Sequence, residues 1–161
     1  MSSRNEDMKK LASTIEDEKT KEYVLKRMLP TMQWYSDESS KHMVIYRVSS
    51  LASLVASASI PVVSLYSTDA IWAKVVIAFL GAVVTFLSAF LILYDAKNVW
   101  VTCRNTREML NSVFYQYYTG EGIFAECKNQ DSRNSKLVKV SEEIINNNVE
   151  KRMSNYAKAS N

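Results

Sequence analysis

Two uncharged segments constrain this chain of 161 residues more than any other feature of its sequence. Positions 48–68 and 75–94 contain no Asp, Glu, Lys, Arg or His. Because an α-helix rises ~1.5 Å per residue, each segment would be about 30 Å long, which matches the hydrocarbon core of a bilayer. We therefore expect an all-α membrane protein with spans at about 46–67 and 71–94.

The connection between the two predicted spans is short. The spans are separated only by Ser67, Thr68, Asp69, Ala70 and the first turn of the second helix. They should therefore form an antiparallel hairpin with both termini on one side. The loop side offers only Lys74, whereas the terminal side carries Lys41, Arg47, Lys97, Arg104 and Arg107. The positive-inside tendency then places both termini in the cytoplasm. The expected organisation is N-terminal cytosolic helices (1–42), the transmembrane hairpin (43–94) and a cytosolic extension with a C-terminal helix (95–161).

Serines share one side of the first predicted span. At ~100° per residue they fall within about a 100° arc, opposite a face of Leu and Val. The second span repeats this design, with small residues on one side and Phe, Leu and Val on the other. The residues on the two small faces include Ser50, Ser53, Ser57 and Ser64 in the first span and Gly81, Thr85 and Ser88 in the second.

Two interpretations of these small faces are open. Small residues let helices in lipid approach closely, and their hydroxyls can bond to a neighbouring helix or to the carbonyl four residues earlier. Alternatively, the hydroxyls line a pore. Because each face is wide enough to contact more than one neighbour, we expect homo-oligomers. In such a ring, Lys74 would add charge at one mouth and Arg47 at the other, unless Lys74 extends to the membrane interface.

The N-terminal flank is charged but amphipathic. Apolar residues recur at helical intervals, namely Met8, Leu11, Ile15, Val24 and Met28. They predict a cytosolic helix that ends near Pro30. Trp34 and Tyr35 follow shortly before the first span. Aromatic rings with a polar edge suit the membrane interface, so we expect both residues there.

The C-terminal flank should contain two helices. The helical pattern continues without a break from the second span, over Asp95 to about Tyr118. One side of this helix is apolar and carries Trp100, Cys103, Leu110, Phe114 and Tyr117. The glycines of TGEG (119–122) should end this helix, and KNQDSRNS (128–135) reads as a loop. A last amphipathic helix is outlined by Leu137, Val140, Ile144, Val149, Met153 and Tyr156.

The sequence does not favour an enzyme. The sole histidine, His42, lies beside Lys41 and is expected at the surface. Cys103 and Cys127 lack CxxC spacing, which predicts two structural thiols in a reducing compartment. No glycine loop of the GxxxxGK type occurs, and basic and acidic residues alternate in both flanks. We expect no catalytic, cofactor or metal site and no nucleic-acid partner.

Several motifs around the hairpin form a recognisable set. They are YVLKRMLPTMQWYSDESSKHMVIYR before the first span, the proline within that span, W-xxx-R-xx-RE-x-L after the second span, and YYTGEG. Over about residues 23–149 the chain resembles the SLATT superfamily of bacterial two-transmembrane effector domains. The resemblance implies an inner-membrane effector that opens a pore or disturbs the membrane in bacterial conflict systems, often beside a nucleotide-signal-producing or sensing protein.

Three residues of the motif after the second span are expected to brace the cytosolic helices. Trp100 would anchor the helix, while Arg104 and Glu108 at i, i+4 can pair with each other or with the N-terminal helices. A brace at this place would transmit cytosolic rearrangements to the membrane helices.

Two functions remain in competition at this point. The leading hypothesis is a homo-oligomeric membrane effector that forms or gates an ion-conducting or membrane-permeabilising pore in bacterial conflict or stress signalling. The alternative is a non-conducting membrane anchor or scaffold whose cytosolic helices recruit a partner. The sequence does not separate them, because hydroxyls serve helix packing and pore lining equally well.

Overall fold

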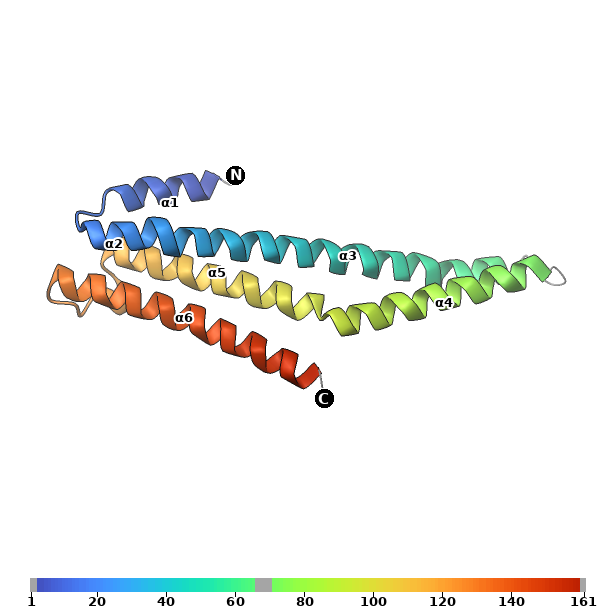
Figure 1. Ribbon diagram of the computed structural model, residues 1–161. Coiled ribbons are helices and arrows are strands. Elements are labelled where there is room, and N and C mark those ends of the chain that lie inside the picture. Colours follow the sequence, from blue (N-terminus) through green and yellow to red (C-terminus); the bar gives the residue numbers. More distant parts are fainter. Residues whose placement is uncertain (1–2, 66–70, 160–161) are drawn as a thin grey trace. The chain divides into compact units, whose positions relative to one another are not determined.

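The computed structural model describes residues 3–65 and 71–159, and these residues form helices joined by short turns (Figure 1). No β-strand occurs within the two ranges, which confirms the all-helical prediction. The chain divides into two compact units. We call Met1–Ser39 with Val101–Asn161 the bundle unit, and Ser40–Trp100 the hairpin unit.

The bundle unit begins with two helices instead of the expected single one. Helix α1 (Ser3–Ser13) and helix α2 (Glu18–Tyr23) are separated by a turn at 14–17. Asp17 starts α2, because its carboxylate accepts hydrogen bonds from the Thr20 backbone N (2.9 Å) and from Thr20 Oγ1 (2.6 Å). This capping pair interrupts the apolar repeat that had predicted one continuous helix.

Pro30 does not end the helix, contrary to expectation. A π-helical turn, η1 (Val24–Met28), follows α2 and leads directly into α3 (Leu29–Leu65). Within this turn the Leu29 backbone N donates to the carbonyl of Val24, five residues earlier. A proline normally clashes with the carbonyl four residues before it. The wider turn just ahead of Pro30 gives its ring the space that a regular α-turn lacks.

Helices α5 (Ala96–Thr119) and α6 (Gln130–Ala159) complete the bundle unit, with a short 3-10 helix η2 (Gly122–Phe124) between them. The predicted apolar side of α5 is confirmed, since Cys103, Leu110, Phe114 and Tyr117 are buried. They pack in an interior that also holds Met8, Val24, Met28, Met32, Phe124 and Leu137. Each large apolar side chain buried in this way stabilises the fold by ~1.5–3 kcal/mol.

Helix α6 departs from its prediction in two ways. It begins at Gln130, so the second part of the expected loop at 128–135 is helical. Its buried face is also rotated, because Val149 and Met153 are 46% and 68% exposed. The buried positions are Asn134, Leu137, Ser141, Ile145 and Asn148. Polar residues can occupy this face because they find hydrogen-bond partners in the bundle. The side chain of Tyr156 lies outside the described part.

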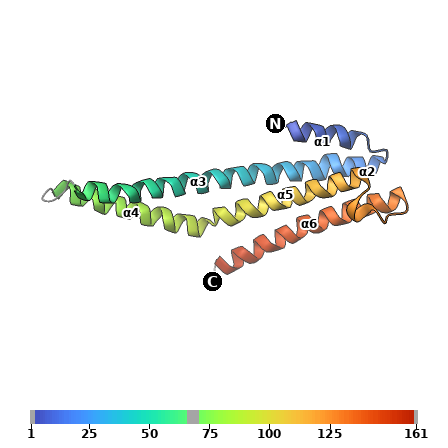
Figure 2. The same cartoon turned by 180° about the vertical axis from the view of Figure 1, so that it is seen from behind.

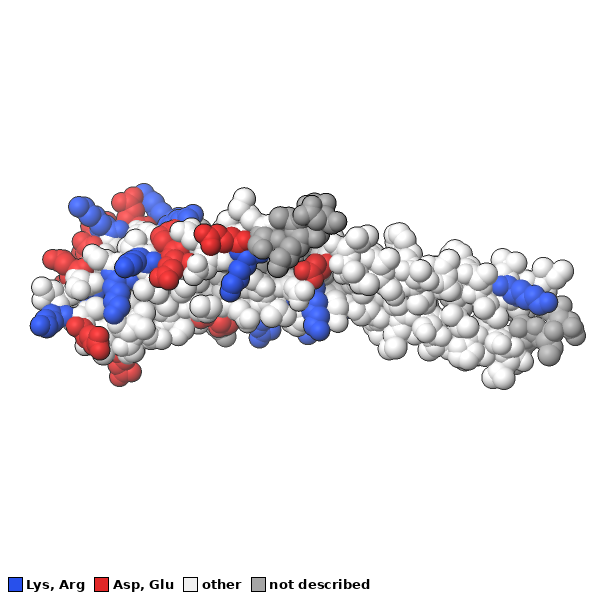
Figure 3. Space-filling view, turned by 90° about the horizontal axis from the view of Figure 1, so that it is seen from below, with Lys and Arg blue, Asp and Glu red and all other residues white. Residues whose placement is uncertain are grey.

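The hairpin unit contains the C-terminal part of α3, helix α4 (Ile71–Tyr94) and the first residues of α5. Within it, α3 and α4 run antiparallel side by side (Figures 1 and 2). The expected connection at 67–70 lies outside the described residues. By length and composition, Glu18–Leu65 and Ile71–Thr119 each contain a segment able to cross a membrane. Only 6% and 0% of these segments are buried, unlike the core helix of a soluble protein. On the face that Figure 3 shows, charged side chains gather over one part of the surface and are almost absent from the apolar part.

The expected uninterrupted helix from the second span to Tyr118 is broken at Asp95. This residue has φ 45°, in the left-handed region that Asp tolerates better than most residues. Its backbone N donates to the Ile92 carbonyl (3.3 Å), and its carboxylate accepts from Asn98 Nδ2 (2.7 Å). Asp95 therefore ends α4 and supports the start of α5.

Candidate functional site

The two helices of the hairpin contact each other through one stripe on each helix. Ala56 on α3 is 9% exposed and Ala73 on α4 is fully buried, so these small residues mark close approaches. Along each helix the same stripe is partly covered. It contains Ser49, Ser53, Ala56, Ile60 and Val63 on α3 and Ala73, Ile77, Leu80, Val84, Leu87 and Leu91 on α4.

Most of the small residues of α4 are not used in this contact. We define the small face of α4 by residues that are all exposed: Lys74, Ala78, Ala82, Thr85, Ser88 and Ala89. Gly81 borders this face, and a Cβ atom added there would meet nothing within 4 Å. The hairpin alone therefore gives neither Gly81 nor the small face a partner helix.

The serines of α3 divide between two surroundings. Ser53 belongs to the contact stripe and Ser50 lies beside it, and both are half-buried, whereas Ser57 and Ser64 are exposed. We call these four residues the small face of α3. The predicted mouth residues Arg47 and Lys74 are both exposed.

The two small faces lie on the same side of the hairpin. At ~100° per residue, each is rotated by about 60–180° from its own contact stripe, and in the same sense along the chain. In an antiparallel pair of helices, two faces that are rotated equally and in the same sense from the shared contact lie on the same side of the pair. The hairpin thus has one side of small and hydroxyl residues.

The opposite side of the hairpin is bulky and apolar. Phe79 and Phe86 on α4 are 68% and 69% exposed, and Leu51 on α3 is 61% exposed. Toward the end of α4 the rings form a ladder, with Phe90 stacked on Tyr94 (5.4 Å between centroids) and Tyr94 stacked on His42 (5.2 Å). His42, expected at the surface, is therefore partly covered.

Hydroxyl groups of α4 are satisfied within their own helix. Thr85 Oγ1 donates to the Gly81 carbonyl (2.9 Å), and Ser88 Oγ donates to the Val84 carbonyl (2.8 Å). Ser59 on α3 bonds in the same way to Val55 (2.8 Å). These hydroxyls can therefore face either a neighbouring helix or water without a large desolvation cost.

In the bundle unit, buried polar groups join three helices. Tyr35 OH on α3 donates to Asn148 Oδ1 on α6 (3.3 Å), and Asn148 Nδ2 donates to Thr106 Oγ1 on α5 (2.6 Å). Thr106 in turn bonds to the Thr102 carbonyl (2.9 Å). We call Tyr35, Asn148 and Thr106 the polar network. Sequence reasoning missed it, because the last helix was outlined by its apolar residues alone and Asn148 was not among them.

The predicted interface aromatics have different surroundings. Tyr35 is only 2% exposed and lies inside the bundle unit, whereas Trp34 is 48% exposed. The two rings meet edge to face, with 5.0 Å between their centroids. The structure therefore assigns Tyr35 to the bundle interior, where its hydroxyl has a protein partner in Asn148.

A second polar cluster links α2, η1 and α6. Glu142 accepts hydrogen bonds from Tyr23 OH (2.9 Å) and from Arg27 Nε and Nη2 (3.1 and 3.2 Å). The hydrogen bond from Arg27 lowers the pKa of Glu142, although partial burial opposes this change. Burial, followed by the bond to Glu142, raises the pKa of Tyr23. The cluster is therefore a neutral phenol and a guanidinium that share one carboxylate.

The YYTGEG motif forms the turn after α5. Gly120 and Gly122 have φ 77° and 59°, which favours glycine at both positions. Arg133 Nη2 donates to the Tyr117 carbonyl (2.9 Å) at the end of α5, and a Cβ at Gly120 would lie 2.6 Å from that nitrogen. Gln116 Oε1 accepts from the Ile123 backbone N (3.2 Å). The motif thus closes the helix with side chains from both of its flanks.

The predicted brace residues differ in burial. Trp100 is half-buried, while Arg104 and Glu108 are exposed. Glu108 Oε1 lies 3.9 Å from Nη1 of its neighbour Arg107, which is a different contact from the expected i, i+4 pair with Arg104.

A comparison with known protein families matches residues 30–132, more than half of the chain, to a family described as "Protein of unknown function (DUF4231)". The matched segment begins near the start of α3 and includes α4, α5 and the YYTGEG turn. Searches of curated proteins and of solved structures gave no match.

Proposed function

The chain belongs to the DUF4231 family of proteins of unknown function, and we propose that it is a membrane effector whose hairpins assemble into a homo-oligomeric pore. In this proposal both termini are cytoplasmic and the bundle unit controls the state of the hairpins. The resemblance to SLATT domains adds the expected setting, which is the bacterial inner membrane during conflict or stress signalling. A nucleotide-signalling or sensor protein is the expected partner.

Exposed apolar side chains support insertion into a bilayer. Leu65 and Leu93 are 82% and 85% exposed, and Phe79 and Phe86 are more than half exposed. In water, so large an apolar surface would drive aggregation, whereas lipid is a suitable solvent for it. The orientation follows from charge, since Lys74 is the single basic residue expected near the loop side.

The one-sided placement of the small faces is the observation that carries the proposal. Thr85 and Ser88 on α4 and Ser57 on α3 are exposed on the side away from the phenylalanines. Inside lipid, such a surface favours contact with another helix, because small residues permit close backbone approach. A second hairpin of the same chain offers a matching surface. Repetition of this contact around an axis gives a closed ring.

A ring of this kind could conduct ions. The part of each small face nearest the axis would expose hydroxyls to water, with Lys74 and Arg47 contributing charge at opposite mouths. The described spans contain no carboxylate, so such a pore would be weakly selective. Movement of the bundle units would change the radius of the ring and thereby gate it.

A non-conducting scaffold is the second candidate. It is favoured by the internal hydrogen bonds of Thr85 and Ser88, which let both hydroxyls pack against a dry helix. In that case the small faces serve only assembly, and the bundle unit recruits a partner to the membrane. Both candidates predict the same oligomer but differ in whether its axis contains water.

Ion flux through purified protein in dye-loaded liposomes separates the candidates. Ser57→Leu and Thr85→Leu place bulk on the small faces, while Val55→Leu and Val76→Leu add similar bulk on other exposed faces. Cross-linking should confirm that each variant still forms oligomers. Flux that is lost in the first pair and retained in the second supports a pore. A stable wild-type oligomer without flux would contradict the pore and favour the scaffold.

A further inference from the structure

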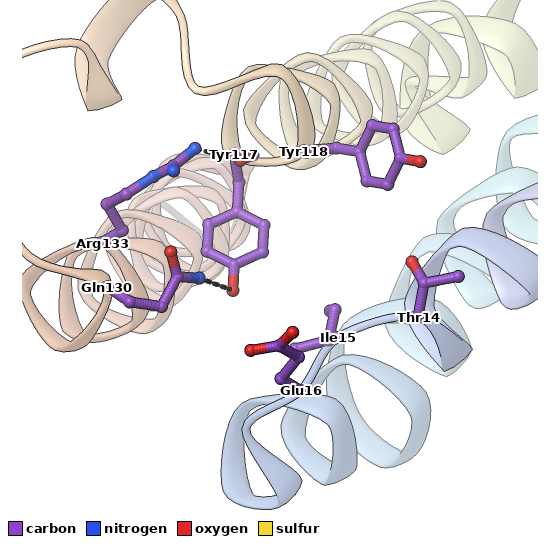
Figure 4. A pocket seen from close by; sticks show the side chains of 7 residues that line it. All are labelled: Thr14, Ile15, Glu16, Tyr117, Tyr118, Gln130 and Arg133. Carbon is purple, nitrogen blue, oxygen red and sulfur yellow. Dashed lines mark hydrogen bonds between the residues drawn. The ribbon is translucent and has the colours of Figure 1, made fainter.

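A cavity of about 320 Å³ lies in the bundle unit, apart from the hairpin and the polar network. Three segments that are distant in sequence line it: the turn after α1, the end of α5 and the start of α6 (Figure 4). The lining residues are Thr14, Ile15, Glu16, Tyr117, Tyr118, Gln130 and Arg133. Its size is at the small end of the range for ligand sites in proteins.

Donors of Arg133 and Gln130 bond to groups at the end of α5 and the start of α6. Arg133 Nη2 donates to the Tyr117 carbonyl (2.9 Å), and its guanidinium carbon lies 5.9 Å from the centre of the Tyr117 ring. Gln130 Nε2 donates to Tyr117 OH (3.2 Å) and to Asn134 Oδ1 (3.2 Å). The Arg133 guanidinium thus caps the carbonyl end of α5 and is directed away from Glu16 (Figure 4), while its Nε is buried without a hydrogen-bond partner among the described residues.

Two hydroxyl donors are engaged as well. Tyr117 OH donates to Asn134 Oδ1 (2.7 Å), and Thr14 Oγ1 donates to the Leu11 carbonyl (2.6 Å). Burial raises the pKa of Tyr117, so its phenol stays neutral over the physiological range. These bonds use the hydrogens of both groups and leave lone pairs and an aromatic ring facing the cavity.

The other lining groups are the Glu16 carboxylate, the Ile15 side chain and the Tyr118 ring with its hydroxyl. Figure 4 shows the Glu16 carboxylate and the Tyr117 ring directed toward a common space, with Tyr118 and Thr14 at its other side. Glu16 is exposed and forms no ion pair among the described residues. Asp17, the next residue, adds a second negative charge close enough to influence Tyr117. A carboxylate beside tyrosine rings is the environment that organic cations prefer.

We propose that this cavity binds an organic cation bearing a guanidinium or alkylammonium group, held by Glu16 and by the rings of Tyr117 and Tyr118. The cation would donate to the carboxylate and stack on the rings. Because the site includes the turn between α1 and α2, an occupant would tie that turn to the ends of α5 and α6. The proposal does not depend on pore formation, and binding can be tested whether or not the hairpin conducts.

Calorimetric titration of the full chain in phosphatidylcholine nanodiscs with agmatine tests the site. We expect saturable binding with a Kd on the order of 0.1–1 mM that weakens as salt is raised. Glu16→Gln should weaken binding about tenfold, and Tyr118→Leu should weaken it several-fold. Glu18→Gln, at an exposed carboxylate that does not line the cavity, is the matched control and should bind as the wild type does.

Further ligands identify the chemistry of the site. Tetramethylammonium should bind more weakly than agmatine but still respond to Tyr118→Leu, while neutral urea should not bind. A short arginine-containing peptide shows whether the site also accepts the same group on a polypeptide. Absence of saturable agmatine binding up to about 10 mM, equal binding by Glu16→Gln, or preferential binding of inorganic phosphate would overturn the proposal. Circular dichroism of each variant verifies that the helices persist.

Discussion

Asn148 on α6 donates a 2.6 Å hydrogen bond to Thr106 on α5, and both side chains are buried. The same amide accepts a bond from Tyr35 on α3, so a single residue links three helices. A buried amide that lacks partners is costly, whereas one with partners favours a single helix register. The polar network therefore fixes how α6 packs on the other two helices within the bundle unit.

Asn148→Ala should loosen α6. The change leaves the Tyr35 and Thr106 hydroxyls without their partner, and we expect a loss of ~1–3 kcal/mol in the free energy of unfolding of the bundle unit. Hydrogen exchange of the α6 amides in the full chain measures this loss directly. Asn147→Ala, at the adjacent exposed position, is the control. Equal protection in the two variants would show that the network is not stabilising.

The Glu142 cluster should make stability depend on pH. Its bonds from Arg27 lower the pKa of Glu142 in the folded state, so the stabilisation is present above its unfolded value of 4.5. It is lost as the pH falls through the lowered folded pKa. Because Arg27 is 54% exposed, we expect a contribution below about 1 kcal/mol.

Urea unfolding followed by Trp34 fluorescence, in a Trp72→Phe, Trp100→Phe background, measures this dependence. The stability difference between the parent and Glu142→Gln should be present at neutral pH and shrink in acid. Glu143→Gln, at the exposed neighbouring position, should show no such trend. A difference that stays constant down to low pH would argue against a role for the Glu142 charge.

Two glycines should respond oppositely to alanine. Gly120 has φ 77° and would bring its new Cβ to 2.6 Å from Arg133 Nη2, so Gly120→Ala should cost about 1–2 kcal/mol. Gly81 is helical with open space around its Cβ position, so Gly81→Ala should be neutral or stabilise the isolated hairpin by about 0.5–1 kcal/mol. Thermal unfolding in detergent compares the stabilities of the two variants with that of the wild type. A Gly120→Ala variant as stable as the wild type would contradict the expected backbone strain.

The break at Asp95 should be sensitive to backbone preference. Asp95→Gly retains access to the left-handed region, whereas Asp95→Leu favours a continuous helix and should cost about 1 kcal/mol if the break is kept. Spin labels at Leu91 and Val99 would report the change, because a continuous helix has a fixed separation between them. Identical label distances in both variants would exclude a role for Asp95 in ending α4.

Charge and hydropathy were sufficient to predict the two long apolar helices and the all-helical fold. The reason is physical, since about twenty uncharged residues in succession are rare outside a membrane span. The division of α4 into small and bulky sides was also visible, because helical periodicity alone determines which residues share a face.

Other features depended on partners that the sequence does not reveal. Tyr35 looks like an interface residue until Asn148 is seen beside it, and the polar positions of α6 look solvated until the bundle is assembled. Pro30 is normally a helix terminator, but the π-turn η1 accommodates it. The cavity at Glu16 combines residues more than a hundred positions apart, which periodicity cannot bring together.

Disulfide cross-linking in native membranes tests the central claim, that the small faces join copies of the chain. Single cysteines at Thr85 and Ser57 are compared with cysteines at Phe86 and Leu51, in a background that lacks Cys103 and Cys127. We predict that mild oxidation yields dimers through Thr85 and Ser57 and few through Phe86 and Leu51. Equal cross-linking at all four positions, or preference for the phenylalanine side, would contradict the account.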